Sequence, residues 1–147
     1  MGLKATIFGL PLERIVTNNL LFTKLPNTGD ERGGSFTVSL DILSFLGRIA
    51  DIHVASVLPG AVRGNHFHTR RKEVLIVLHE TGWALHWDEG EDPPAQVMEF
   101  SGPGAEVILV KPSSSHAVRN SGARTLAIIG LSSEPYDPQE TIWRRVT

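Results

Sequence analysis

The most informative stretch of this chain is RGNHFHTRRKE, which spans residues 63–73. Side chains alternate between the two faces of an extended strand, so His66 and His68 point to one face and Phe67 to the other. The following TRRK is short and highly charged, as expected of a turn. The β-branched and aliphatic run EVLIVLHE after it predicts a strand that begins at Glu73. A hairpin at this turn would return the Glu73 carboxylate to the two imidazoles.

A second histidine-bearing stretch is PSSSHAVRN, at residues 112–120. His116 follows a serine-rich turn and opens an apolar segment, so it is in a position to supply a third imidazole from another strand. Imidazole and carboxylate together suit a borderline divalent ion such as Zn, Fe, Mn or Ni. The alternative is a polar strand face on which each imidazole hydrogen-bonds to a neighbour, which is the commoner role of a single buried histidine.

The composition is that of an ordinary globular chain. With 147 residues the length predicts one domain, and the net charge of −2 gives no reason to expect nucleic acid or a membrane surface as a partner. The absence of cysteine excludes disulfides and thiolate metal sites. The N-terminus does not resemble a signal peptide, and no stretch is long enough for a membrane span, so we expect a cytoplasmic protein.

Many short strand-like segments, bounded by Gly, Pro, Ser or Asn, follow one another along the chain. We expect strands at residues 5–10, 18–25, 35–43, 48–58, 61–68, 73–80, 83–87, 97–100, 105–111, 116–119 and 125–131. Strands at this spacing predict an all-β, double-sheet jelly roll in a single domain, residues 1–147. Within it, residues 1–28 would form N-terminal strands or an arm, residues 29–131 the barrel, and residues 132–147 an irregular tail across the barrel.

Other polar and aromatic residues are expected to have ordinary roles. Nothing in the spacing assigns a function to the remaining three histidines, His53, His79 and His86. Trp83 and Trp87 lie on one face of a predicted strand and are expected in the core. The basic turn, residues 70–72, is expected to be solvated.

The two histidine stretches resemble the motifs of the cupin superfamily. The first motif is matched by Gly60, His66, His68 and Glu73, with Gly82 two residues late, and the second by His116 and Asn120. Ser113 stands where the family usually has glycine. The resemblance implies a jelly-roll barrel and a metal held by His66, His68, Glu73 and His116, with zinc expected first. With this resemblance, a metal or acid–base site becomes the preferred interpretation of His66 and His68, in place of ordinary hydrogen-bonded histidines.

A narrower resemblance covers residues 30–146. RGNHFH with the downstream KE, and the tail EPYDP, resemble the C-terminal cupin domain of the bifunctional capsule-biosynthesis enzyme that epimerises and reduces a UDP-linked amino sugar. More remotely, the chain is similar to nucleotide-sugar ketoisomerases and to the rhamnose-pathway epimerase, in which the histidine acts as a base without metal. This implies a substrate contact for Arg63 and a base role for His66. If all three histidines bind metal, Tyr136, His53 or a metal-bound hydroxide would be the base.

Three functions are compatible with these residues. The first is a metal-dependent cupin that epimerises or isomerises a nucleotide-linked keto sugar in polysaccharide biosynthesis, with His66 and Tyr136 as catalytic residues. The second is an iron-dependent oxygenase of a small molecule with the same ligands. The third is a non-catalytic sugar- or metabolite-binding cupin. In each case a small molecule is the expected partner, and a homodimer formed through sheet edges is expected because exposed edges need covering.

Overall fold

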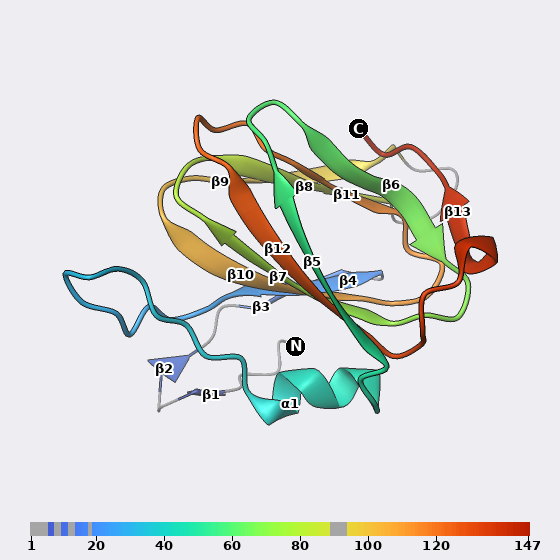
Figure 1. Ribbon diagram of the computed structural model, residues 1–147, viewed down its shortest axis with the longest axis horizontal. Coiled ribbons are helices and arrows are strands. Elements are labelled where there is room, and N and C mark those ends of the chain that lie inside the picture. Colours follow the sequence, from blue (N-terminus) through green and yellow to red (C-terminus); the bar gives the residue numbers. More distant parts are fainter. Residues whose placement is uncertain (1–5, 8–9, 12–13, 18, 89–93) are drawn as a thin grey trace.

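The structure is a computed structural model that describes residues 6–7, 10–11, 14–17, 19–88 and 94–147. Two antiparallel sheets face each other (Figure 1). The larger sheet has the strand order β3 (Arg14–Val16), β4 (Leu20–Lys24), β10 (Gly104–Val110), β7 (Glu73–His79), β12 (Leu126–Ser132) and β5 (Asp51–Val57). The smaller has the order β13 (Thr141–Trp143), β6 (Val62–His68), β11 (His116–Arg119), β8 (Trp83–Trp87) and β9 (Gln96–Phe100). The predicted double-sheet jelly roll is confirmed.

The predicted strands are confirmed from β5 to β12, and differences occur near the two ends of the chain. Of the N-terminal segments, residues 18–25 contain β4. Residues 5–10 contain β1 (Thr6–Ile7) and the first residue of β2 (Leu10–Pro11), and these two strands pair in a separate ribbon. Residues 5, 8, 9 and 18 lie outside the described part of the chain. The tail is less irregular than expected, because a short 3-10 helix, η2 (Pro138–Glu140), leads into β13, which pairs with β6.

The predicted strand at residues 35–43 is wrong. Its second half forms α1 (Leu40–Leu43), which continues into the 3-10 turn η1 (Ser44–Leu46). Ile42 and Leu46, four residues apart, are both buried in one cluster against the larger sheet, and this spacing is the helical one. The packing of this helix on the sheet therefore outweighs the apparent alternation of the sequence.

The predicted hairpin between residues 68 and 73 is also wrong, because β6 and β7 belong to different sheets. The connection at residues 69–72 is a corner that carries the chain from one sheet to the other. Glu73 therefore reaches the histidines across the interior of the barrel, from the facing sheet. The same change of sheet occurs between β7 and β8.

Two apolar clusters hold the layers together. The first lies between the sheets and contains Phe22, Trp83 and Trp87, so the prediction that both tryptophans are core residues is confirmed. The second lies between the outer face of the larger sheet and α1. In β10, Val107 belongs to the second cluster and Ile108 to the first, as strand alternation requires.

Among the described residues, no helix has the length and apolar character needed to cross a membrane.

Candidate functional site

The three histidines of the site come from two paired strands of the smaller sheet. His66 and His68 lie on β6, and His116 opposes His66 from the start of β11. The ring centroid of His66 lies 5.0 Å from that of His68 and 5.3 Å from that of His116. Phe67 points to the opposite face, where the guanidinium of Arg144 lies 4.3 Å from its ring centroid. The alternation predicted from the sequence is therefore present.

A β-bulge places His66 opposite His116. His116 pairs with His66 while Ala117 pairs with Gly64, so Asn65 is the extra residue of β6. Gly64 and Asn65 both have positive φ, at 104° and 60°. Only glycine fits at position 64, since an added Cβ would lie 2.5 Å from the carbonyl oxygen of His116. The bulge was not predicted from the sequence.

Glu73 begins β7 in the facing sheet and completes the cluster. Its Oε2 lies 3.4 Å from Nε2 of His68 and 3.5 Å from Nε2 of His116. One potential ligand atom from each of His66, His68 and Glu73 lies within 4.8 Å of the others. The structure thus brings together the four residues for which metal binding was predicted, from β6, β7 and β11.

Hydrogen bonds to Nδ1 orient the two buried imidazoles. Nδ1 of His116 lies 3.1 Å from the carbonyl oxygen of Ser114, which accepts only if that nitrogen carries the proton. Nδ1 of His68 lies 3.3 Å from the hydroxyl of Thr141. A proton on Nδ1 leaves the lone pair on Nε2, the nitrogen that faces Glu73 in both residues. Metal-binding histidines are commonly held in this way.

Burial and neighbouring groups shift the pKa values of Glu73 and His66. Burial acts to raise the pKa of Glu73, but the neighbouring imidazoles of His68, His116 and His66 outweigh it and lower that pKa to about 2. Burial, reinforced by the charge of His116, lowers the pKa of His66 to about 4. Near neutral pH the site therefore presents an ionised carboxylate beside a neutral His66 imidazole.

This cluster fits a divalent metal ion. Nε2 of His68 and Oε2 of Glu73 are buried without a hydrogen-bond partner, which is costly unless another group satisfies them. Two ligand atoms bound to one ion at about 2.0–2.2 Å in tetrahedral geometry lie about 3.4 Å apart. The separations of 3.4 and 3.5 Å match that value. His66, His68, Glu73 and His116 would hold the ion.

The cluster opens onto two adjoining cavities of about 480 and 380 Å³. They share five lining residues, His53, His66, Glu73, Leu75 and Ile128. Tyr136 lines the larger cavity with its side chain largely exposed, beside the guanidinium of Arg71 at 5.9 Å. Arg63 lines the smaller one, and its Nε donates to the carbonyl of Ser56 at 2.7 Å. All the residues predicted for substrate contact or catalysis thus line one or both cavities.

Two of the histidines without a predicted role lie outside these cavities. His79 is buried with Glu106, whose Oε2 lies 2.5 Å from its Nε2. His86 lines a separate hollow with Glu99 and Arg119.

The expectation that the basic turn is solvated is wrong for one residue. Arg71 is 7% exposed, lines the larger cavity, and forms two hydrogen bonds with Asp51 at 2.9 and 3.1 Å.

Sequence reasoning missed two residues of the C-terminal tail. Thr141 contacts His68 as described above, and Glu140 is buried with its Oε2 3.7 Å from Nδ1 of His68. Both lie about seventy residues from β6, and only their position next to the EPYDP segment was available as a signal.

The chain folds as a two-sheet jelly roll. Histidines from two strands of one sheet and a carboxylate from the facing sheet are directed into its cavity, and this combination defines a cupin. The chain belongs to the family described as the polysaccharide biosynthesis C-terminal domain, whose model matches residues 29–141. No curated protein matches it.

Three similar solved structures are all under 25% identical, so they establish the fold alone. One is a variant of the 3,4-ketoisomerase QdtA from Thermoanaerobacterium thermosaccharolyticum in complex with TDP. It is 20% identical with a TM-score of 0.66, and the match covers 86% of this chain and 88% of the QdtA chain. NovW, a 4-keto-6-deoxy sugar epimerase from Streptomyces spheroides, is 15% identical with a TM-score of 0.70, covering 88% and 72%. The capsular polysaccharide assembling protein CapF from Staphylococcus aureus is 23% identical with a TM-score of 0.59. That match covers 95% of this chain but only 36% of CapF.

Proposed function

We propose that this protein epimerises or isomerises a nucleotide-linked keto sugar in polysaccharide biosynthesis, with a divalent metal ion bound by His66, His68, Glu73 and His116. The observation that carries the proposal is the cluster itself, in which buried, unsatisfied ligand atoms face a cavity at separations suited to one ion. The family and its similar structures support the substrate class. QdtA has been solved with TDP-4-keto-6-deoxyglucose, and NovW is described as a 4-keto-6-deoxy sugar epimerase.

Both reactions remove a proton from a carbon next to a carbonyl and return a proton to the same or a neighbouring carbon. A bound divalent ion supplies a positive charge that stabilises the oxygen as negative charge develops on it. Zinc suits the ligand set best, with Fe, Mn or Ni as alternatives.

The side chains lining the two cavities have separate tasks. Arg63 presents a guanidinium, a group suited to phosphate oxygens, at the smaller cavity. A coordinated nitrogen is not available as a base, so His53 and Tyr136 are this chain's candidates for proton exchange at the cavity when His66 is a metal ligand. When no metal is bound, the neutral His66 imidazole can itself accept the proton.

The test is solvent proton exchange. Protein supplied with zinc is incubated in D₂O with TDP- and UDP-linked 4-keto sugars, and deuterium incorporation is followed by mass spectrometry and NMR. We expect exchange in the wild type, loss of exchange in His66→Ala with folding intact, and retention in His86→Ala, which changes a histidine outside the cavities. Absence of exchange in the wild type with every sugar, or unchanged exchange in His66→Ala, would overturn the proposal.

We also propose a homodimer formed through β5. This strand is the edge of the larger sheet, so one side of its backbone is unpaired by any described strand. Ile52 and Val54 on β5, and Ile129 opposite Val54 on β12, are exposed apolar residues. Antiparallel pairing of two copies of β5 would satisfy this unpaired backbone and place the apolar side chains of the two copies beside one another on the same face of the extended sheet. Light scattering at micromolar concentration should give a dimer for the wild type and a monomer for Val54→Lys; a monomeric wild type would refute the dimer.

A further inference from the structure

Glu140 is a charged residue in an unusual environment. It ends η2 in the C-terminal tail, immediately before β13, and its side chain is 4% exposed. One carboxylate oxygen, Oε1, accepts hydrogen bonds from the backbone N–H groups of Arg70 and Arg71, the latter at 2.7 Å. These residues form the corner between β6 and β7, so Glu140 ties the tail to the segment that joins His68 to Glu73.

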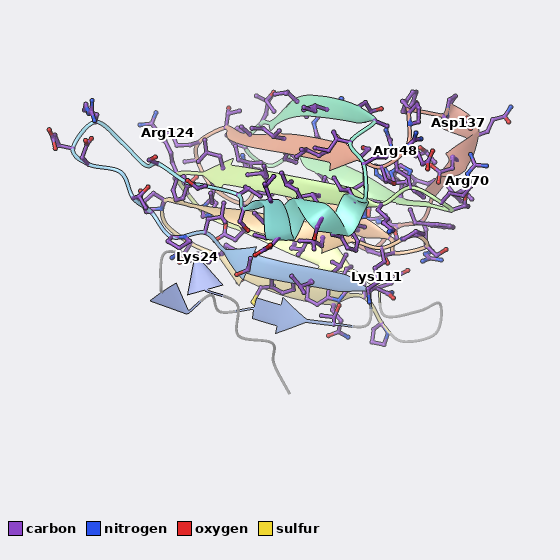
Figure 2. All side chains as sticks on the ribbon, turned by 90° about the horizontal axis from the view of Figure 1, so that it is seen from below. Lys24, Arg48, Arg70, Lys111, Arg124 and Asp137 are labelled. Atoms are coloured by element: carbon purple, nitrogen blue, oxygen red, sulfur yellow. The ribbon has the colours of Figure 1, made fainter. Side chains whose placement is uncertain are left out.

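The corner and the tail also meet at the surface. Arg70 and Asp137 lie at the same end of the barrel in Figure 2, with Nη2 and Oδ2 3.7 Å apart. This pair is exposed and contributes little energy. The guanidinium of Arg71 is directed to Asp51 instead. The side chain that faces the carboxylate of Glu140 is the imidazole of His68.

The second carboxylate oxygen of Glu140 faces that imidazole. Oε2 lies 3.7 Å from Nδ1 of His68, and the Thr141 hydroxyl lies 3.3 Å from the same nitrogen. An ionised carboxylate only accepts hydrogen bonds, so it favours a proton on Nδ1. Glu73 competes from the other side, because its Oε2 lies 3.4 Å from Nε2. A proton on Nε2 would satisfy Glu73 but would block that nitrogen from binding metal.

We infer that Glu140 is a positioning residue that holds His68 with its proton on Nδ1 and its Nε2 lone pair towards the metal site. This inference rests on the metal site of the proposed function and adds that metal binding depends on the docked C-terminal tail. Partners that fix the orientation of a ligating histidine commonly change metal affinity by about 10–100-fold when they are removed.

The variant for the test is Glu140→Gln. Its amide oxygen can still accept from the two backbone N–H groups at the corner, while its NH₂ group replaces the acceptor that faces His68. The matched control is Glu134→Gln, the same change in the same tail, at a half-exposed residue that pairs with Arg48. Zinc affinity is measured by competition with a chelator, and the melting temperature of each metal-free protein reports folding.

We expect zinc to bind about 10–100-fold more weakly to Glu140→Gln, with Glu134→Gln like the wild type and all three metal-free proteins folded. Long-range ¹H–¹⁵N spectra of the zinc-loaded wild type should show Nε2 of His68 bound to zinc and a slowly exchanging proton on Nδ1.

Two results overturn the inference while leaving the proposed function intact: equal zinc affinity in wild type and Glu140→Gln, or a wild type in which zinc binds His68 through Nδ1. The second result is measured on the wild type alone, so it tests the inference even if Glu140→Gln does not fold. A folded wild type that binds no divalent metal would overturn both the inference and the metal-dependent function.

Discussion

Gly64 supports the site through its backbone, and replacing it with alanine is the sharpest test of the bulge. Two costs follow from the structure. The first is the positive φ of 104°, for which a residue with a Cβ loses about 1–2 kcal/mol. The second is contact of the new Cβ with backbone atoms of β11, at 2.5 Å from the His116 oxygen and 2.8 Å from Cα of Ala117. Backbone shifts of this kind cost about 1–3 kcal/mol.

Gly60→Ala is the matched control. Gly60 also has positive φ, at 79°, but apart from Gly60 and its two chain neighbours no described residue has an atom within 4 Å of the position that its Cβ would take, so only the first cost applies. The loss of unfolded-state entropy on changing glycine to alanine is common to both variants and cancels in the comparison. We therefore expect Gly64→Ala to lose about 2–5 kcal/mol of unfolding free energy and Gly60→Ala about 1–2 kcal/mol.

The assay is urea denaturation of both variants, followed by zinc titration of the folded proteins. Because the clash falls on the carbonyl of His116, Gly64→Ala should also weaken zinc binding, whereas Gly60→Ala should not. Equal destabilisation in the two variants, or full zinc affinity in Gly64→Ala, would refute the bulge geometry and the role given to it.

Two further predictions concern the core. Burial opposes protonation of His79, but its hydrogen bond with Glu106 acts in the other direction, and the pKa of His79 is raised above the usual 6.5. The pair therefore stabilises the fold fully below pH 6.5, and the stabilisation is lost as the pH rises through the folded-state pKa. Urea denaturation between pH 6 and 9 should show this loss in the wild type and not in Glu106→Gln; the same slope in both would contradict it. Trp83 is fully buried and stacked on Phe100 at 4.3 Å, so Trp83→Ala should cost about 3–5 kcal/mol of unfolding free energy, against less than about 0.5 kcal/mol for the exposed Trp143→Ala.

Strand alternation and motif spacing were sufficient to predict the jelly roll and the meeting of His66, His68, Glu73 and His116. They did not show how the chain passes from His68 to Glu73, because a charged four-residue turn such as residues 69–72 serves equally for a hairpin and for a corner between sheets. The carboxylate reaches the imidazoles by either path.

Other features depend on tertiary contacts that a local pattern does not contain. The segment at residues 35–43 alternates like a strand, yet Ile42 is buried on a helix because the outer face of the larger sheet needs covering. The bulge had a weak local signal in the pair Gly64 and Asn65, both residue types that tolerate positive φ. Glu140 had only its position next to the EPYDP segment as a signal, since its two backbone partners at the corner are about seventy residues away.

The most direct test of the proposed metal site is the metal content of protein purified without an affinity tag. Elemental mass spectrometry would compare the wild type with His66→Ala and His116→Ala, and with His86→Ala as a control outside the cavities. We expect a stoichiometric divalent ion, zinc first, in the wild type and the control, and its loss from both site variants while they remain folded. A folded wild type that takes up no divalent ion even when it is supplied, or retention of the ion in both site variants, would contradict the metal-dependent function.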